Sequence, residues 1–105
     1  MKAPEDLQME RKAFLTRLKP EFREQYIEAH NNFAAALHAR YVDAGVRNIS
    51  IFLWEDQLFM YVEAEEFARV SAVLANDPLD NAWQQHVGPM KDSESAELLE
   101  IFHLG

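Results

Sequence analysis

A β-hairpin is predicted by the stretch from Val46 to Glu63, VRNISIFLWEDQLFMYVE. Its first part, Val46 to Trp54, is rich in Ile and Phe, which favour strands. Glu55-Asp56-Gln57 forms a polar turn, and Leu58 to Glu63 follows as the partner strand. This hairpin supplies the second and third strands along the chain, and the other elements are predicted before and after it.

A strand and a long helix are predicted before the hairpin. The strand covers Lys12 to Lys19, where the side chains alternate between two faces. Pro20 suits the first turn of a helix, because its missing N–H costs nothing there. The helix is predicted from Glu21 to Ala44, with Gly45 as its C-cap. Residues on its inward face recur at steps of three or four, namely Phe22, Tyr26, His30, Phe33, Leu37, Tyr41 and Ala44.

Two helices and a strand are predicted after the hairpin. The first helix covers about Glu65 to Ala75 and is broken by Asn76-Asp77-Pro78. Pro78 opens a further short helix that ends near Gly88-Pro89 and carries Trp83 and His86. After the polar stretch Lys91 to Ser95, Leu98 to Leu104 is predicted to be the last strand.

The resulting order β-α-β-β-α-β is typical of the α+β ferredoxin-like fold, an antiparallel sheet with helices on one face. Strands this apolar would leave a large exposed patch on the bare face of the sheet. Pairing two sheets face to face covers that patch, so we expect a homodimer, a dimeric α+β barrel. Residues 11–105 are expected to form a single domain, and residues 1–10 a leader that is mobile or adds a helical turn.

The composition excludes several classes of function. The chain has 105 residues and a formal net charge of -8, which argues against a nucleic-acid or anionic-membrane surface. It contains no cysteine, so thiolate catalysis and disulfides are excluded. Met1 to Glu10 lacks the apolar centre of a secretory signal, and no apolar run approaches a membrane span. A cytoplasmic protein is the default expectation.

One pair of side chains on the long helix carries the functional interpretation. Tyr26 and His30 are four residues apart, so a helix places them on one face, one above the other. A phenol beside an imidazole can bind a polar ligand and move its protons, because an unperturbed His titrates at about 6.5. A buried core histidine and a packing tyrosine are the alternatives from spacing alone.

Six segments spread over nearly the whole chain from Arg11 onward carry a resemblance to a known family. They are RKAF (11–14), LKP (18–20), EQYIEAH (24–30), GVRNISIFL (45–53), LF (58–59) and ELLEIFHL (97–104). On these segments the chain resembles the L-rhamnose mutarotase family. The resemblance implies a dimeric α+β barrel that acts on a monosaccharide and needs no metal or coenzyme.

The resemblance also implies roles for individual residues. His30 falls on the family's catalytic proton donor, and Tyr26 on its substrate-binding tyrosine. Trp83 falls on the second residue of a Trp-Trp pair that lines the sugar site. The chain departs from the family pattern in three places. Asn32 to Leu37 lacks the Trp, Pro and Glu that typically follow the family's histidine, Ile49 stands where a sugar-binding tyrosine is common, and Ala82 replaces the first Trp of the pair.

The remaining histidines have no role in the family pattern. His86 is either a residue at the surface or helix end, or a second imidazole in the pocket that completes an acid–base pair. His38 is eight residues from His30, about 12 Å along a helix, which is too far for both to bind one metal. His103 lies in the predicted last strand with no visible partner. We therefore predict no metal site and no cofactor.

The leading hypothesis is an isomerase, a cofactor-independent aldose mutarotase that interconverts the α and β anomers of L-rhamnose or a related 6-deoxy sugar such as L-fucose. The candidate site contains His30 as the proton donor, with Tyr26, Trp83, Ile49, Ala82 and His86 around the substrate. A non-catalytic sugar or metabolite binder is one alternative. A small α+β-barrel oxygenase or haem-degrading protein is another, and only analogy of fold supports it.

Overall fold

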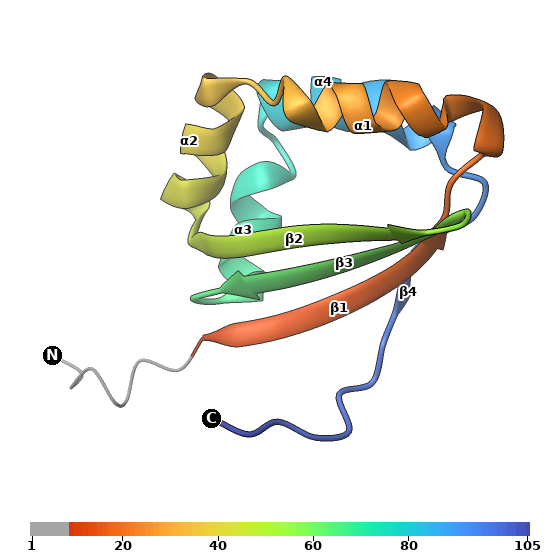
Figure 1. Ribbon diagram of the computed structural model, residues 1–105. Coiled ribbons are helices and arrows are strands. Elements are labelled where there is room, and N and C mark those ends of the chain that lie inside the picture. The colour runs from red at the N-terminus through yellow and green to blue at the C-terminus, as the bar shows by residue number, and fades with distance from the viewer. Residues whose placement is uncertain (1–8) are drawn as a thin grey trace, which may run out of the picture.

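The computed structural model describes residues 9–105, and the first strand begins inside the stretch predicted as a leader. Residues 1–8 of that predicted leader lie outside the described residues. The elements of the described chain follow the predicted order (Figure 1). They are β1 (Glu10–Arg17), η2 (Pro20–Phe22), α1 (Arg23–Asn31), α2 (Ala35–Ala44), β2 (Val46–Trp54), β3 (Gln57–Ala64), α3 (Phe67–Leu74), α4 (Pro78–Val87), η3 (Gly88–Met90) and β4 (Ala96–Glu97).

The predicted hairpin forms one edge of an antiparallel sheet, with β2 as the edge strand and β3 inside it. β2 pairs with β3 from Val46 opposite Ala64 to Trp54 opposite Gln57, so the connecting loop is Glu55-Asp56. Glu55 takes a φ of 54°, as tight hairpin loops require. The strand order is β2-β3-β1-β4, and the helices cover one face of the sheet (Figure 1). The predicted ferredoxin-like α+β fold is therefore confirmed.

Alternation along β1 separates the two faces of the sheet as predicted. Thr16 lies opposite Leu58 of β3 on the helix-facing side, and Thr16 is buried. Leu15 lies opposite Phe59 on the bare side. The pleat sends successive side chains to opposite faces, so one strand serves both surfaces.

The single helix predicted over residues 21–44 is wrong, because the chain breaks it in two. α1 ends at Asn31, and α2 begins at Ala35 after Ala34 takes an extended backbone with ψ of 136°. The Asn32 side chain donates to the Glu28 carbonyl and to the Glu28 carboxylate, which ends the helix. Asn competes for backbone groups in this way and is a poor residue for a helix interior. α2 consequently runs across the end of α1 instead of continuing it (Figure 1).

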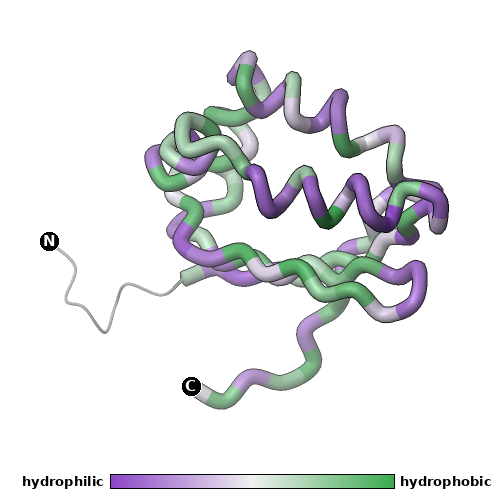
Figure 2. Tube along the Cα trace, turned by 45° about the horizontal axis from the view of Figure 1, so that its top comes forward, coloured by the Kyte–Doolittle hydropathy of each residue, from purple (hydrophilic) through white to green (hydrophobic). Residues whose placement is uncertain are grey.

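The last strand predicted over residues 98–104 is also wrong. Only Ala96 and Glu97 pair with β1, and the Leu98 N–H donates to the Ala13 carbonyl before the chain leaves the sheet. Hydrophobic stretches of this tail are separated by hydrophilic ones (Figure 2). Its apolar residues favour a strand, but a strand needs a hydrogen-bonded neighbour, and the ladder with β1 ends there. The exposed apolar side chains of the tail include Leu99, Ile101, Phe102 and Leu104.

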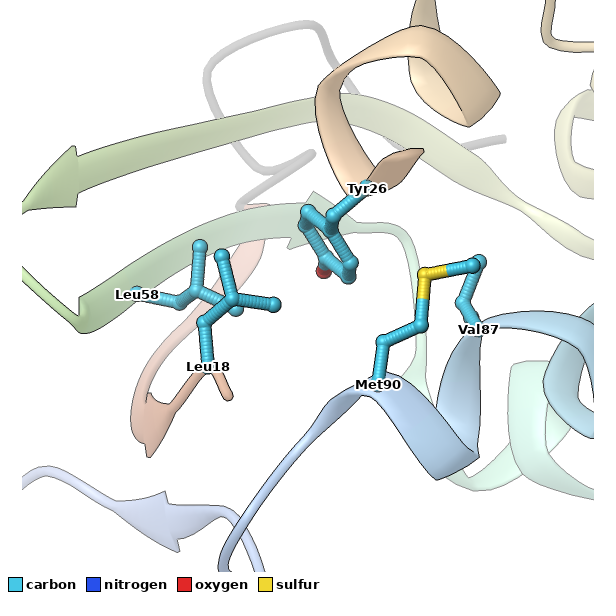
Figure 3. Close-up of a cluster of buried hydrophobic side chains, with 5 residues drawn as sticks. All are labelled: Leu18, Tyr26, Leu58, Val87 and Met90. Carbon is cyan, nitrogen blue, oxygen red and sulfur yellow. The ribbon is translucent and has the colours of Figure 1, made fainter. Parts of the chain in front are cut away.

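A small hydrophobic core closes one end of the space between the helices and the sheet. Tyr26 of α1 points toward the side chains from β3, α4 and η3 that surround it (Figure 3). Its other members are Leu18, Leu58, Val87 and Met90, and all five are less than a tenth exposed. This cluster fixes α1 and α4 relative to the sheet. No helix among residues 9–105 has the length and apolarity to cross a membrane.

Candidate active site

A cavity of about 800 Å³ lies between the helices and the helix-facing side of the sheet. Such a volume lies within the range of small-molecule sites in proteins. The walls come from α1, α2, α3, α4 and the two strands of the hairpin. The side chains that line it include Tyr26, His30, Phe33, His38, Tyr41, Ile49, Asp80, Trp83, Gln84 and Lys91.

Tyr26 and His30 lie together on α1 and both line this cavity. Their ring centroids are 4.4 Å apart, as the four-residue spacing predicts. The His30 Nδ1 is 2.8 Å from the Tyr26 backbone carbonyl. A carbonyl only accepts, so Nδ1 carries the hydrogen, and the neutral ring leaves its Nε2 lone pair free. His30 is therefore arranged to accept a proton at Nε2.

Burial keeps the His30 ring neutral near pH 7. Desolvation lowers the pKa of His30 from its ordinary value of 6.5, and the nearby charge of Lys91 lowers it further. The hydrogen bond to the Tyr26 carbonyl acts in the opposite direction. Burial also raises the pKa of Tyr26, so its phenol stays protonated.

Trp83 of α4 contacts His30 directly, and both rings line the cavity. The two ring centroids are 4.9 Å apart with the planes at 81°, an edge-to-face contact. Phe33, in the break between α1 and α2, meets the same indole at 4.9 Å. Phe33 also contacts Tyr41 of α2 at 5.8 Å. These contacts form a continuous aromatic wall, the surface on which the apolar C–H face of a sugar can lie.

The structure brings four of the six predicted site residues together and leaves two outside. Ile49 of β2 lines the cavity with Tyr26, His30 and Trp83. Ala82 and His86 are exposed and do not line it. A helix turns by about 100° per residue, so residues 80, 83, 84 and 87 share the inner face of α4, whereas 82 and 86 point away. The centroids of the His86 and Trp83 rings are 6.2 Å apart.

Several cavity residues were absent from the predicted site. Asp80 and Gln84 lie on α4, and their spacings of three residues from Asp80 to Trp83 and four from Asp80 to Gln84 are the signal that could have found them. Tyr41 was assigned to the inner face of the helix without a role. Lys91 was assigned to a polar loop, but a bridge between Leu18 and Lys91 holds it beside β1. Burial lowers the pKa of its amine.

His30 and His38 line the same cavity. They lie on two different helices, α1 and α2, so the distance predicted along one straight helix does not apply. Within residues 9–105, no three or more His, Asp or Glu side chains come close enough together to hold a metal ion.

The sheet order and the helices on one face define the α+β ferredoxin-like class, and solved structures share it. The L-rhamnose mutarotase from Formosa agariphila superposes with a TM-score of 0.77 at 24% identity, covering 91% of this chain and 99% of that one. The tetracenomycin F2 cyclase from Streptomyces glaucescens gives a TM-score of 0.63 at 19% identity, with the same coverage of both chains. At these identities the likeness shows the fold alone.

Sequence comparison identifies the family. Residues 11–104 match the family model described as L-rhamnose mutarotase. A protein named L-rhamnose mutarotase from Opitutus terrae is 38% identical over 104 residues, covering 91% of this chain and 99% of the relative. One of the same name from Klebsiella pneumoniae is 34% identical over 103 residues, with the same coverage. The chain belongs to the L-rhamnose mutarotase family, as the sequence predicted.

Proposed function

We propose that this protein is a cofactor-independent aldose mutarotase that interconverts the α and β anomers of L-rhamnose or a related 6-deoxy sugar. Membership of the L-rhamnose mutarotase family supports the reaction class. The observation that carries the proposal is the His30 ring, whose Nδ1–H is held by the Tyr26 carbonyl while Nε2 is left free beside Trp83. A neutral imidazole so placed can take a proton and return it.

The proposed reaction opens the pyranose ring and closes it on the other face. His30 Nε2 takes the proton of the anomeric hydroxyl as the C1–O5 bond breaks, and the ring oxygen takes a proton from water. After rotation about C1–C2, O5 attacks C1 again and its proton returns to water. The imidazolium then gives its proton to the anomeric oxygen. His30 is thus the proton donor of the closing half-reaction, and every proton is recovered.

The surrounding side chains are proposed to hold the sugar during this cycle. Trp83 offers its ring to the C–H face of the pyranose, and the Tyr26 phenol, which burial keeps protonated, bonds a hydroxyl. Ile49 forms an apolar wall of the cavity. Ala82 and His86 point away from the cavity, so we propose no sugar contact for them within one subunit.

We also propose that the protein is a homodimer, paired through the bare face of the sheet. On that face Phe52 is 62% exposed and Trp54 is 68% exposed, and Phe59 lies opposite Phe52 on β3. Side chains of this size on one face form an apolar patch that a second copy would cover. A cytoplasmic location stays a prediction from the sequence.

A non-catalytic sugar binder is the second candidate, and the cavity wall favours it at one position. Ile49 lines the cavity where the family commonly has a sugar-binding tyrosine, so this chain lacks one hydroxyl donor there. Tight sugar binding without accelerated anomer exchange would identify such a binder. No feature of the cavity favours the oxygenase alternative.

The deciding measurement is saturation-transfer NMR between the α and β anomeric protons of L-rhamnose, L-fucose and other aldoses, with and without protein. We expect accelerated exchange for one sugar, and we expect His30→Ala to abolish it while circular dichroism stays unchanged. His103→Ala is the control, because His103 lies in the tail and does not line the cavity. A fully active His30→Ala variant would contradict the role of His30, and no acceleration with any sugar would contradict the mutarotase.

A further inference from the structure

A second polar group of the cavity lies at the end away from the core, on the first turn of α4. Three residues of α4 mark successive positions along the cavity. Val87 packs with Tyr26 in the core, Trp83 contacts His30, and Asp80 is bonded by Tyr41. The rise between Trp83 and Asp80 is about 4.5 Å, one helical step. The cavity therefore has an imidazole on one side of the indole and a carboxylate on the other.

The Asp80 carboxylate is bonded at only one of its two oxygens. The Tyr41 hydroxyl donates to Oδ1 in a short hydrogen bond, and the Gln84 amide donates to the same atom at 3.4 Å. No described residue donates to Oδ2. No fully buried side-chain oxygen or nitrogen in residues 9–105 lacks a partner, so Oδ2 must reach open space. Asp80 is only 8% exposed and lines the cavity, which is the space available to it.

Helix capping does not account for this carboxylate. Asp77 is the N-cap of α4, and its side chain accepts from the Leu79 and Asp80 backbone N–H groups. In a capping box, the side chain at the position of Asp80 would reach back to the Asp77 N–H, but that N–H donates to the Leu74 carbonyl. The positive end of the helix dipole favours a carboxylate here but does not turn it toward Tyr41. A buried carboxylate is costly unless hydrogen bonds satisfy it, and a ligand hydroxyl would complete the set.

We propose that Asp80, held by hydrogen bonds from Tyr41 and Gln84, is a substrate-binding residue. Its Oδ2 accepts hydrogen bonds from the sugar hydroxyls farthest from the anomeric centre. The inference rests on the proposed function and deepens it. In a pyranose, C4 lies across the ring from C1, and C3 lies across from O5. With C1 and O5 at His30 and the ring against Trp83, the hydroxyls on C3 and C4 face Asp80. The ligand class is thus a pyranose with free hydroxyls at C3 and C4.

The hydrogen bonds from Tyr41 and Gln84 are suited to keep the free oxygen an acceptor. Burial and the bond to Asp80 raise the pKa of Tyr41, so its hydroxyl remains a donor throughout the neutral range. Both donors bond Oδ1, which leaves the lone pairs of Oδ2 available to a ligand. Hydrogen bonds to a charged acceptor are shorter and stronger than neutral ones, so one such contact can select among sugars.

The test is the binding and exchange of L-rhamnose and its 2-, 3- and 4-deoxy analogues by the wild type and by Asp80→Asn. Asn keeps an oxygen for Tyr41 and Gln84 and replaces the free oxygen with an amide donor. We expect L-rhamnose to bind about tenfold more weakly to the variant, because a charged acceptor is lost. The KM should rise by the same factor with kcat within about twofold, since the lost contact is uniform through the reaction.

The deoxy sugars separate a direct contact from a change in packing. The 3-deoxy or 4-deoxy analogue should bind the wild type about tenfold more weakly than L-rhamnose does, and Asp80→Asn should weaken it no further. The 2-deoxy analogue should still lose affinity on substitution. The wild-type series alone tests the proposal if the variant does not fold, because equal affinity for all four sugars would overturn it.

Asp77→Asn is the matched control, since it makes the same change on the same helix. Asp77 is also 8% exposed, is paired with Arg40 and does not line the cavity, so sugar binding should be unchanged. Two results would overturn the role of Asp80. One is an unchanged affinity of Asp80→Asn for L-rhamnose, and the other is an equal loss of affinity for all four sugars in this variant. Binding without exchange would overturn only the mutarotase, and absence of any L-rhamnose binding by the wild type would overturn both.

Discussion

The charge state of His30 is the central property of the site at the scale of single residues. Its ring is half-buried beneath Trp83, and desolvation together with Lys91 holds its pKa below 6.5. The proposed exchange needs the neutral ring at the start of each cycle. Activity should therefore fall as the pH drops through the pKa of His30. A variant with a higher His30 pKa should lose activity at a higher pH.

Lys91→Met tests this charge coupling. Methionine preserves much of the length of the side chain but removes its positive charge, so the pKa of His30 should rise. The loss of exchange activity at low pH should then begin at a higher pH than in the wild type. The pKa is measured from the His30 ring proton shifts in an NMR titration, and the activity by anomer exchange over the same pH range.

Lys19→Met is the control for this measurement. Lys19 is also half-buried near the end of β1, but it does not line the cavity. Its substitution should leave the His30 titration where it is. An unchanged titration in Lys91→Met would show that the charge of Lys91 does not reach the imidazole.

At the scale of elements, the break between α1 and α2 shapes the cavity. On one straight helix, His30 and Tyr41 would be eleven residues and about 16 Å apart. The break turns α2 across α4, and Tyr41 then reaches Asp80 while Phe33 fills the corner against Trp83. The second polar end of the cavity exists because this helix ends at Asn31.

Gly45→Ala tests the junction between α2 and β2. Gly45 has a φ of 109°, and a Cβ built there would be 3.3 Å from the Arg69 guanidinium. An L side chain is strained in this region, so the free energy of unfolding should fall by about 1–2 kcal/mol. Urea unfolding followed by circular dichroism measures the change.

Gly88→Ala is the matched substitution at a glycine with a negative φ. Gly88 has a φ of -55°, and outside its chain neighbours and local helix backbone no atom lies within 4 Å of a Cβ built there. Alanine restricts the unfolded chain, which stabilises, whereas Pro89 disfavours the α region for a preceding residue with a Cβ, so the free energy of unfolding should change by less than about 1 kcal/mol. Equal effects at both glycines would contradict the strain assigned to Gly45.

At the scale of the whole molecule, one face of the sheet and the tail remain without a covering layer. Figure 1 shows all helices of the described chain on the opposite face, with the tail leaving the sheet after β4. The Arg11 guanidinium pairs with Glu100 at 2.9 Å, which holds the first part of the tail beside β1. Beyond this pair, apolar residues of the tail are exposed together with those of the bare face.

Substituting both Phe52 and Trp54 with Ser tests the proposed dimer. Large aromatic side chains contribute much of the area that an interface buries, so the variant should be a monomer at concentrations where the wild type is a dimer. Sedimentation equilibrium measures both masses. Val73→Ser is the control, because Val73 is 42% exposed on α3 in the helical layer. A monomeric wild type at the highest accessible concentration would contradict the dimer.

The sequence by itself determined the hairpin, the order of the elements along the chain and the family. The Ile- and Phe-rich run from Val46 to Trp54 and the polar turn after it are local properties, and β3 differs from the prediction by one residue at each end. The spacing of Tyr26 and His30 is local as well, so their contact on one helix was predictable. Local patterns carry this information because each depends on residues a few positions apart.

Only the tertiary structure decided where the helix breaks, where the last strand ends and what stands across the cavity from His30. Asn32 is bonded to Glu28 within a pattern that predicts a continuing helix. The tail is as apolar as a strand but leaves the edge of β1. Tyr41 and Asp80 are 39 residues apart, and their bond depends on how α2 and α4 pack. Contacts of this kind depend on how whole elements pack together, and the pattern of a short stretch of sequence does not determine that packing.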